Sequence, residues 1–316
     1  MAKTIGVVLS DRVTAGLVID HRIEGTLRSF PESSDDESGL VELHTDGLIK
    51  VISEQAILAR GNHHDIPAVG VALPGLIRNG VVEEAPNLPQ LKGARIAELV
   101  TAELRNQGLR CQVNIVNDAD GMAAGLAASL GKLGSMIRVW TLGIGIGFGR
   151  YPFAPGVWEG GHTSVTLDDK ENFCGCGGRG HIEGIMGHRA MRLRFLDMEP
   201  EEVFLEARKG PQAGPQAERC LRFVRFWHKA LAAGTANSIH MSGPGKFYLT
   251  GFNVRFVDLN MLRDYLHQMI KMSPLQGYTI EIVEDNPQIR VLGAAVAAEQ
   301  SIVYAQNTGL FTAFKG

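Results

Sequence analysis

The chain has 316 residues, of which 45% are hydrophobic and 21% charged, with a formal net charge of −3 at pH 7. This composition is that of an ordinary globular protein, and the length exceeds what one hydrophobic core usually serves, so we expect two domains. The small negative charge gives no basis for binding nucleic acid or an anionic membrane, and no apolar run is long enough to span a bilayer.

The N-terminal part of the chain alternates between apolar strands and amphipathic helices, separated by an acidic loop at 31–39 and a proline-rich loop at 85–93. Strands are predicted at 3–9, 15–20, 66–73 and 111–116, the first two as a hairpin across a short turn, and helices at 39–58, 94–108 and 118–133. This alternation predicts an α/β fold with parallel strands.

Two pairs of residues directly follow predicted strands. Pro74-Gly75 ends the strand 66–73, and Asn117-Asp118 ends the strand 111–116. Because ligands of open α/β sheets gather at the carboxyl ends of strands, both pairs are candidates for one cleft. Asp118 is either the N-cap of the next helix or a catalytic carboxylate, and neighbouring residues can divide the two roles.

A strand beginning at residue 137 runs into alternating glycines at 143, 145, 147 and 149. Such a loop can bring backbone N–H groups close to phosphate oxygens. Alternating glycines also mark tight turns and close strand packing, so both interpretations stay open. The segment has neither the lysine of a Walker motif nor the spacing of a Rossmann motif.

The segment 158–183 combines histidines, cysteines and glycines in a pattern typical of a metal loop. Its candidate ligands are His162, Cys174, Cys176 and His181. Imidazole and thiolate are the ligands that zinc prefers, and four of them complete a structural site. The alternative is that the two cysteines are only small buried side chains. Glu159 and Glu183 flank the ligands and can accept hydrogen bonds from a polar ligand beside the metal.

The remainder of the chain is mostly helical. Helices are predicted at 201–210, 217–241 and 258–270, with strands at 246–252 and 279–284 and a closing helix at 289–306. The start of the chain lacks the apolar region of a signal peptide, and the four cysteines fit a reducing compartment, so we expect a cytoplasmic protein.

Several segments together resemble the ROK family of sugar kinases and related repressors. They are VALPGLIRNGVVEEAPNLP, NIVNDADGMAAG, WTLGIGIGFG, WEGGH, CGCGGRGHIE, YLTGF and LGAA. The resemblance implies the actin-like ATPase fold (hexokinase-like, ribonuclease-H-like), with two α/β domains and a cleft between them. The first domain would comprise residues 1–118 together with the closing helix 293–316, and the second residues 119–292, including the metal loop.

The resemblance also implies roles for individual residues. Asp118 matches the general base that takes the proton of a sugar hydroxyl. The positions that border or hydrogen-bond the sugar are matched by Pro74, Gly75, Asn117, Glu159, His162 and Glu183. The nucleotide loops are matched by Gly143, Gly145, Gly147 and Gly251. The implied cofactors are structural Zn²⁺, ATP and Mg²⁺, and the implied assembly is a homodimer or homotetramer.

Departures from the family pattern fall mainly on the nucleotide side. Val8 stands where the family has an aspartate that helps to hold magnesium, and the glycines of that first loop are replaced by Ser10 and Asp11. Ile144 replaces a threonine and Phe252 a glycine, whereas His181 replaces a cysteine that can be exchanged without loss of a zinc ligand. Asp11 is a candidate for a shifted carboxylate.

The sequence therefore predicts an ATP-dependent hexose kinase similar to glucokinase. The alternative is a catalytically impaired sugar-binding member with a degenerate nucleotide site. A repressor is disfavoured, because the first strand begins by residue 3, which leaves no helix-turn-helix ahead of it, and the net charge is negative.

Overall fold

The computed structural model describes residues 3–32, 40–154, 156 and 159–307. Most of the predicted acidic loop and Trp158, the first residue of the predicted metal loop, lie outside these ranges. The chain forms two compact units. The first comprises Met1–Ile137, Gly149–Val157 and Asn286–Gly316, and the second Arg138–Phe148 and Trp158–Asp285.

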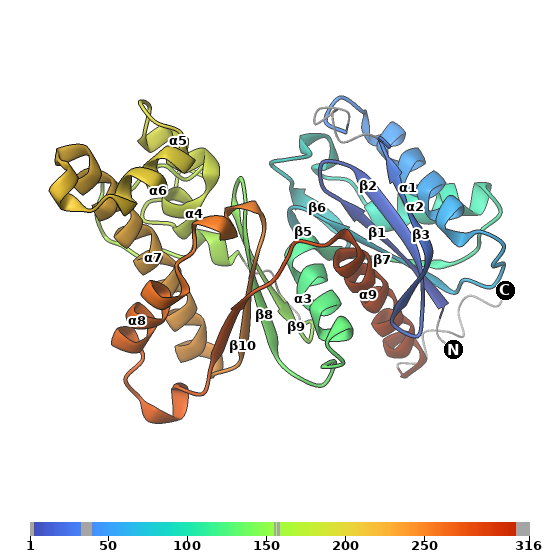
Figure 1. Cartoon of the computed structure of the whole chain (residues 1–316). Coiled ribbons are helices and arrows are strands. Elements are labelled where there is room, and N and C mark those ends of the chain that lie inside the picture. Colours follow the sequence, from blue (N-terminus) through green and yellow to red (C-terminus); the bar gives the residue numbers. More distant parts are fainter. Residues whose placement is uncertain (1–2, 33–39, 155, 157–158, 308–316) are drawn as a thin grey trace. The chain divides into compact units, whose positions relative to one another are not determined.

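The first unit is built on a five-stranded sheet with the order β3-β2-β1-β4-β7 (Figure 1). Its strands are β1 (Lys3–Leu9), β2 (Val13–Ile19), β3 (Arg22–Phe30), β4 (Ala68–Leu73) and β7 (Gln112–Asn117). Strands β1, β4 and β7 are parallel, whereas β2 and β3 run antiparallel to their neighbours. The predicted hairpin of 3–9 and 15–20 is confirmed by the antiparallel pairing of β1 with β2 across a short turn, and the predicted parallel strands by β1, β4 and β7. Strand β3 was not predicted.

Helices cover both faces of this sheet. Helices α1 (Thr45–Arg60) and α2 (Ile96–Asn106) share a core with Ile5, Val7 and Leu9 of β1. Helix α9 (Pro287–Asn307) packs against the other face, where it meets Val8, and against α3 (Asp118–Ser129) (Figure 1). The predicted boundary at residue 118 assigned α3 to the second domain, whereas its packing on α9 is within the first unit.

A glycine in β1 allows α9 to lie directly on the sheet. A Cβ atom at Gly6 would lie 1.9 Å from the carbonyl oxygen of Val291, which no side chain tolerates. The segment that closes the chain is thereby packed against its first strand. A short hairpin of β5 (Leu76–Arg78) and β6 (Val81–Glu84) and the short helix η1 (Pro89–Leu91) also belong to the first unit.

The second unit has a four-stranded sheet with the order β11-β10-β8-β9. Its strands are β8 (Ile137–Leu142), β9 (Ile146–Tyr151), β10 (Lys246–Thr250) and β11 (Thr279–Ile282). Its helices are α4 (Ile182–Met186), α5 (His188–Arg194), α6 (Pro200–Arg208), α7 (Pro215–Ser242) and α8 (Leu259–Met269). The alternating glycines therefore belong to a turn between β8 and β9 and to β9 itself.

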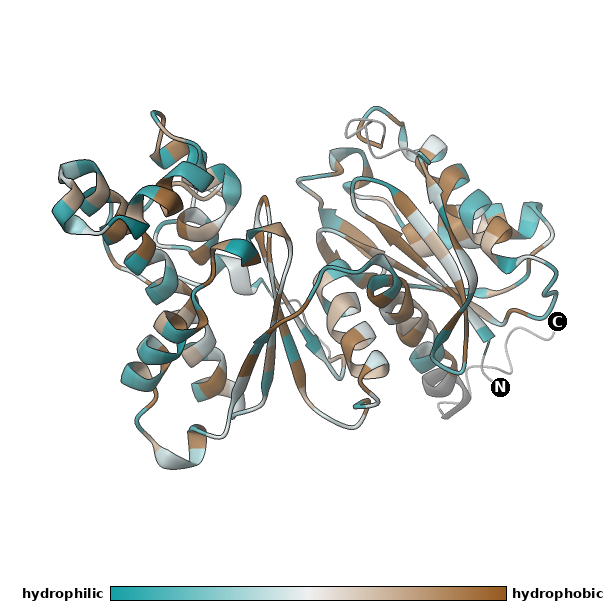
Figure 2. Ribbon diagram, in the orientation of Figure 1, coloured by the Kyte–Doolittle hydropathy of each residue, from teal (hydrophilic) through white to brown (hydrophobic). Residues whose placement is uncertain are grey.

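Hydrophobic residues concentrate along the strands of each unit, while the outward faces of the helices carry hydrophilic residues (Figure 2). Trp140 and Trp227 are among the largest fully buried side chains of the second unit. No helix in the described part of the chain combines the length and hydropathy needed to cross a membrane.

Candidate functional site

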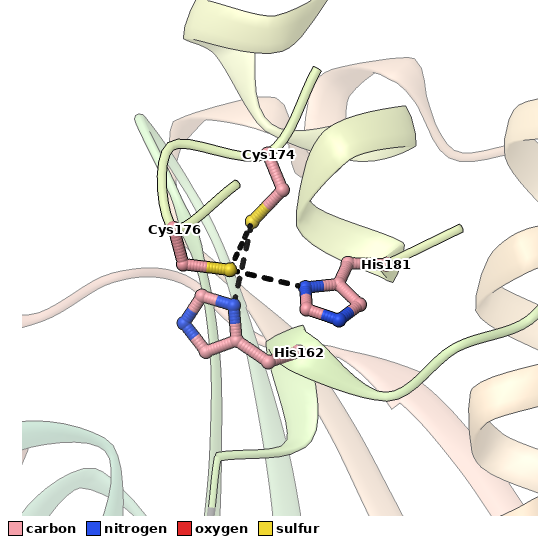
Figure 3. Close-up of side chains that lie close together, drawn as sticks. All are labelled: His162, Cys174, Cys176 and His181. Carbon is pink, nitrogen blue, oxygen red and sulfur yellow. Dashed lines mark hydrogen bonds between the residues drawn. The ribbon is translucent and has the colours of Figure 1, made fainter. Parts of the chain in front are cut away.

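The four predicted metal ligands come together in the second unit (Figure 3). The sulfur of Cys174 lies 3.4 Å from that of Cys176 and 3.4 Å from Nδ1 of His162. The sulfur of Cys176 lies 3.3 Å from Nδ1 of His181, and all four ligand atoms lie within 4.8 Å of one another. The ligands converge because a loop with tight glycine turns carries both cysteines back toward the short helix η2 (Gly160–His162).

This arrangement fits a tetrahedral zinc ion. Zinc–sulfur and zinc–nitrogen bonds of ordinary length place neighbouring ligand atoms roughly 3.3–3.8 Å apart. The three contacts of 3.3–3.4 Å lie at the short end of this range. Burial raises the pKa of the Cys174 thiol to about 12, so a bound cation is needed to stabilise its thiolate. Burial and the nearby His162 lower the pKa of His181, which favours the neutral imidazole that ligates metals.

A buried ion pair anchors the metal loop to helix α5. Arg194 donates to Glu171 with both terminal nitrogens, one of them at 2.9 Å, and Glu171 is only 8% exposed. The guanidinium also lies 4.3 Å from the ring centroid of Phe173. The main chain of Glu171 in turn accepts from the N–H of Gly180 at 2.7 Å. The loop is thus fixed by contacts separate from its metal ligands.

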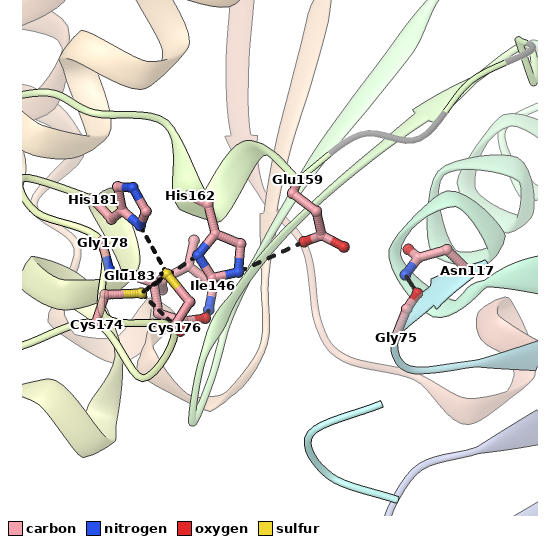
Figure 4. Close-up of polar contacts among 10 residues, drawn as sticks. All are labelled: Gly75, Asn117, Ile146, Glu159, His162, Cys174, Cys176, Gly178, His181 and Glu183. Atoms are coloured by element: carbon pink, nitrogen blue, oxygen red, sulfur yellow. Dashed lines mark hydrogen bonds and ion pairs between the residues drawn. The ribbon is translucent and has the colours of Figure 1, made fainter. Parts of the chain in front are cut away.

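The two ring nitrogens of His162 face different groups. Its Nδ1 faces the cysteines, while its Nε2 lies 3.9 Å from a carboxylate oxygen of Glu159 (Figure 4). Glu159 and the ring of His162 are partly exposed. The imidazole can therefore ligate a metal through one nitrogen and present the other to a polar ligand beside Glu159.

Glu183 links the metal loop to the turn between β8 and β9. One carboxylate oxygen accepts from the N–H of Ile146 at 3.1 Å, and the other lies 3.5 Å from the sulfur of Cys174. A Cβ atom at Gly145 would lie 2.5 Å from the Glu183 carboxylate. A larger residue at 145 would therefore push the Glu183 carboxylate away from the N–H of Ile146, so glycine here supports the placement of Glu183 whether or not phosphate binds.

In the first unit, Pro74-Gly75 and Asn117-Asp118 lie at one edge of the sheet. Leu73 of β4 pairs with Asn117 of β7, and Asn117 Nδ2 donates to the carbonyl of Gly75 at 3.0 Å (Figure 4). Asn117 is the N-cap of α3, since its Oδ1 accepts from two helical N–H groups. Asp118 occupies the first helical position and accepts from the N–H of Ala119 at 2.9 Å. The capping role left open by the sequence falls mainly to Asn117.

Of the four predicted nucleotide glycines, three lie at two turns of the second unit and one lies in a strand. Gly143 and Gly145 form the turn between β8 and β9, closed by a hydrogen bond of 3.0 Å from the N–H of Gly143 to the Gly145 carbonyl. Gly147 is in β9. Gly251 follows β10 with φ +93°, and a Cβ there would lie 2.5 Å from the Leu142 carbonyl.

The first loop has an apolar residue where the family has its magnesium aspartate. Val8 is 3% exposed and packs with Val18 and Ala72. The carboxylate of Asp11 accepts from the hydroxyl of Ser10 at 2.6 Å and lies 3.8 Å from Arg12. Val8 therefore offers no carboxylate at the position of the family's aspartate, and Asp11 stays a candidate for a shifted one.

The sequence did not identify Glu171 and Arg194, or the buried Asn253 and the His188 beside it, as residues of this region. Asn253 Nδ2 donates to the Gly143 carbonyl at 2.9 Å. Glu171 lies within the metal loop, and His188 and Asn253 follow closely after quoted motifs, but no local pattern distinguishes these side chains from surface polar residues. Only the packing of α5 and of the short helix η4 (Phe252–Phe256) brings them here.

Comparison with known proteins relates most of the chain to one family. The model of the ROK family matches residues 41–300. The chain is also 24% identical over 266 residues to a glucokinase of Pyrobaculum calidifontis, a match that covers 79% of this chain and 84% of the glucokinase.

Two solved structures resemble this one over almost its full length. The ROK hexokinase of Thermus thermophilus gives a TM-score of 0.75 at 20% identity, covering 96% of this chain and 99% of the hexokinase. A ROK family glucokinase of Streptomyces griseus, solved in complex with glucose and AMPPNP, gives 0.63 at 21% identity, covering 95% of this chain and all of the glucokinase (100%). At these identities the likeness shows the shared fold.

Proposed function

The chain belongs to the ROK family and has the actin-like ATPase fold, and on this premise we propose that it transfers the γ-phosphoryl group of ATP to a hexose hydroxyl. Glucokinase and hexokinase are the activities named for the relatives. The supporting observation in this chain is the two-sided His162, which can ligate a metal through Nδ1 while Nε2 faces a ligand beside Glu159.

The proposed reaction forms a bond between a sugar oxygen and the γ-phosphorus and breaks the bond to the ADP oxygen. Asp118 accepts the hydroxyl proton as the oxygen attacks. Its position fits this role, because Asn117 caps the helix and Asp118 lies at the carboxyl edge of β7. Asn117 has one amide hydrogen left for a sugar hydroxyl after donating to Gly75.

The sugar hydroxyls would be bound by Glu159, His162 and Glu183, with Pro74 and Gly75 at its border. His162, Cys174, Cys176 and His181 would hold zinc. The ion would act structurally, fixing the ring of His162 and the loop that ends at Glu183. Magnesium would enter with ATP, bound by its phosphates. Cytoplasmic location and assembly into a dimer or tetramer stay predictions.

A catalytically impaired sugar-binding protein is the second candidate, and the burial of Val8 favours it. A carboxylate at that position would help neutralise charge at the γ-phosphate, which is worth several kcal/mol in general terms. Here the position is part of the apolar core. The proposed sugar-binding residues do not distinguish a kinase from an impaired sugar-binding protein, because both require them.

Hexose-dependent ADP formation, measured across a panel of hexoses together with direct hexose binding, tests the proposal. We expect turnover with at least one sugar, and a loss of about 10²- to 10⁴-fold in kcat for Asp118→Asn with hexose affinity retained. Asp264→Asn, an exposed carboxylate of α8, is the control and should keep full activity. Hexose binding without turnover would support the impaired protein, and undiminished activity of Asp118→Asn would remove Asp118 as the base.

A further inference from the structure

A buried asparagine and a histidine hold the turn between β8 and β9. The carbonyl of Gly143 accepts from Asn253 Nδ2 at 2.9 Å and from the backbone N–H of His188 at 3.0 Å. Asn253 is fully buried, and its Oδ1 lies 3.3 Å from Nδ1 of His188. Since Nδ2 of Asn253 donates to a carbonyl, Oδ1 is its acceptor, and Nδ1 of His188 carries the hydrogen.

The second ring nitrogen of His188, Nε2, does not help to hold the turn. Within the described residues, no hydrogen bond is made to Nε2 of His188, and the side chain is only half-buried. The ring packs edge-to-face against Phe252, with centroids 5.3 Å apart and an interplanar angle of 68°. Asn253 and Phe252 thus fix the tautomer and the orientation of the ring, which leaves Nε2 for a ligand.

The same turn offers further donors. The carbonyls of Gly143 and Ile144 accept from the N–H groups of His188 and Arg189. The N–H groups of Ile144 and Gly145 make no hydrogen bond in the part of the chain that the structure describes, and Ile144 is 61% exposed. Successive free N–H groups of a turn are typical of anion sites. The His188 ring is held against this turn by Asn253.

We propose that His188 binds a phosphate group of the nucleoside triphosphate donor, together with the N–H groups of Ile144 and Gly145. In the imidazolium form of the ring, Nε2 donates to a phosphate oxygen while Nδ1 still donates to Asn253. The inference rests on the proposed kinase function and adds to it a donor-binding residue in the second unit.

Two substitutions separate binding from structure. In His188→Asn the shorter side chain places its amide nitrogen near the position of Nδ1, so the hydrogen bond to Asn253 is kept while the group facing the donor is lost. In His188→Gln the amide nitrogen reaches near the position of Nε2. His267→Asn, at an exposed histidine of α8, is the control.

The test is calorimetric titration of magnesium AMPPNP into hexose-saturated protein, with steady-state KM for ATP and for the hexose. We expect the Kd for AMPPNP and the KM for ATP to rise about tenfold or more in His188→Asn, and less in His188→Gln. Hexose affinity and the thermal midpoint should stay unchanged, which a purely structural role would not give.

The outcomes distinguish this inference from the function on which it rests. Wild-type protein that binds hexose but no AMPPNP would overturn both the proposed function and the inference. Wild-type protein that binds AMPPNP, with His188→Asn and His188→Gln binding it equally well, would overturn the inference alone. A rise in Kd with a matching fall in thermal midpoint in both variants would also overturn it, since the side chain would then act only through the fold.

Discussion

The metal loop of the second unit and the β1–β2 turn of the first unit differ in the burial of their polar side chains. In the metal loop, Glu171 is buried with a partner that satisfies both of its oxygens. At the β1–β2 turn, Val8 joins the apolar core and the polar Ser10 and Asp11 are exposed and bonded to each other. Burying a polar group costs free energy unless the group is paired. Of these two regions, the chain buries a polar group only in the metal loop, where the group is paired, and leaves the polar Ser10 and Asp11 of the β1–β2 turn exposed.

This difference indicates where ligand-binding geometry is preorganised. A paired, buried polar group keeps nearby ligand atoms in fixed positions, whereas an exposed turn bonded to itself holds nothing else in place. The part of the site proposed to bind the sugar and the metal is therefore the more preorganised part. The donor side depends on the β8–β9 turn and the residues around it.

The largest expected effect comes from removing a metal ligand. Cys176→Ser should reduce bound zinc from about one ion per chain to almost none, because a hydroxyl is a poor replacement for thiolate. Hexose affinity should fall as well, since His162 loses its fixed orientation. Metal analysis of protein purified without chelators, with binding assays, gives both quantities.

The control for this substitution is Cys111→Ser in the first unit, which should leave the metal content unchanged. Burial raises the pKa of Cys111 to about 11, so its thiol does not compete as a ligand. Wild-type protein without zinc would show that the ion pair alone holds the loop. The metal would then contribute nothing to the preorganisation of this region.

A carboxylate restored at Val8 should destabilise the fold. Val8→Asp places an ionisable group among Val18, Ala72 and Val291, and we expect a loss of about 4 kcal/mol in the free energy of unfolding. Val8→Thr, of nearly the same volume, should cost less. Denaturant unfolding measures both. Unchanged stability of Val8→Asp with increased ADP formation would mean that the first loop accommodates a magnesium ligand after all.

The buried ion pair of the metal loop should contribute strongly to stability. Glu171→Gln leaves the Arg194 guanidinium without its charge partner, at an expected cost of about 3 kcal/mol. Asp169→Asn in the same loop is the matched control, because the Asp169–Arg179 pair is exposed and such pairs contribute about 0–1 kcal/mol. Equal unfolding free energies of the two variants would contradict the distinction between buried and exposed pairs in this loop.

The smallest expected effect is a pH dependence from His228, another buried polar group of the second unit. Its Nδ1 lies 2.8 Å from the Val224 carbonyl, and its Nε2 accepts from the N–H of Asp258 at 2.8 Å. Burial lowers the pKa of His228, so the folded chain keeps the ring neutral. Its contribution to stability is complete above the unfolded pKa of about 6.5 and declines as the pH falls toward the folded pKa, by at most ~1.4 kcal/mol per pH unit.

Unfolding free energies measured at several pH values between 7.5 and 5 test this dependence. We expect His228→Asn to show a smaller decline than the wild type, while His64→Asn, at an exposed position, keeps the wild-type decline. The same decline in all three proteins would exclude His228 as its source.

The sequence alone determined the fold class, most strands of both sheets and the choice of metal-loop residues. Hydrophobic periodicity identified β1, β4 and β7, and the spacing of cysteines and histidines identified four side chains that the structure brings together. These signals are local, because strand patterns and ligand spacings depend on residues near one another in the chain. Strand β3 escaped prediction because its exposed residues leave only a weak apolar pattern.

Tertiary structure alone decided which polar groups support these residues. The pairing of Arg194 with Glu171, the contact of Asn253 with Gly143, and the choice of Asn117 over Asp118 as the cap all join residues through packing or through backbone geometry. It also showed that Gly145 admits Glu183 and that Val8 is core. Hydrogen bonds and close approaches of this kind act over a few ångströms between segments far apart in sequence, so no local pattern records them.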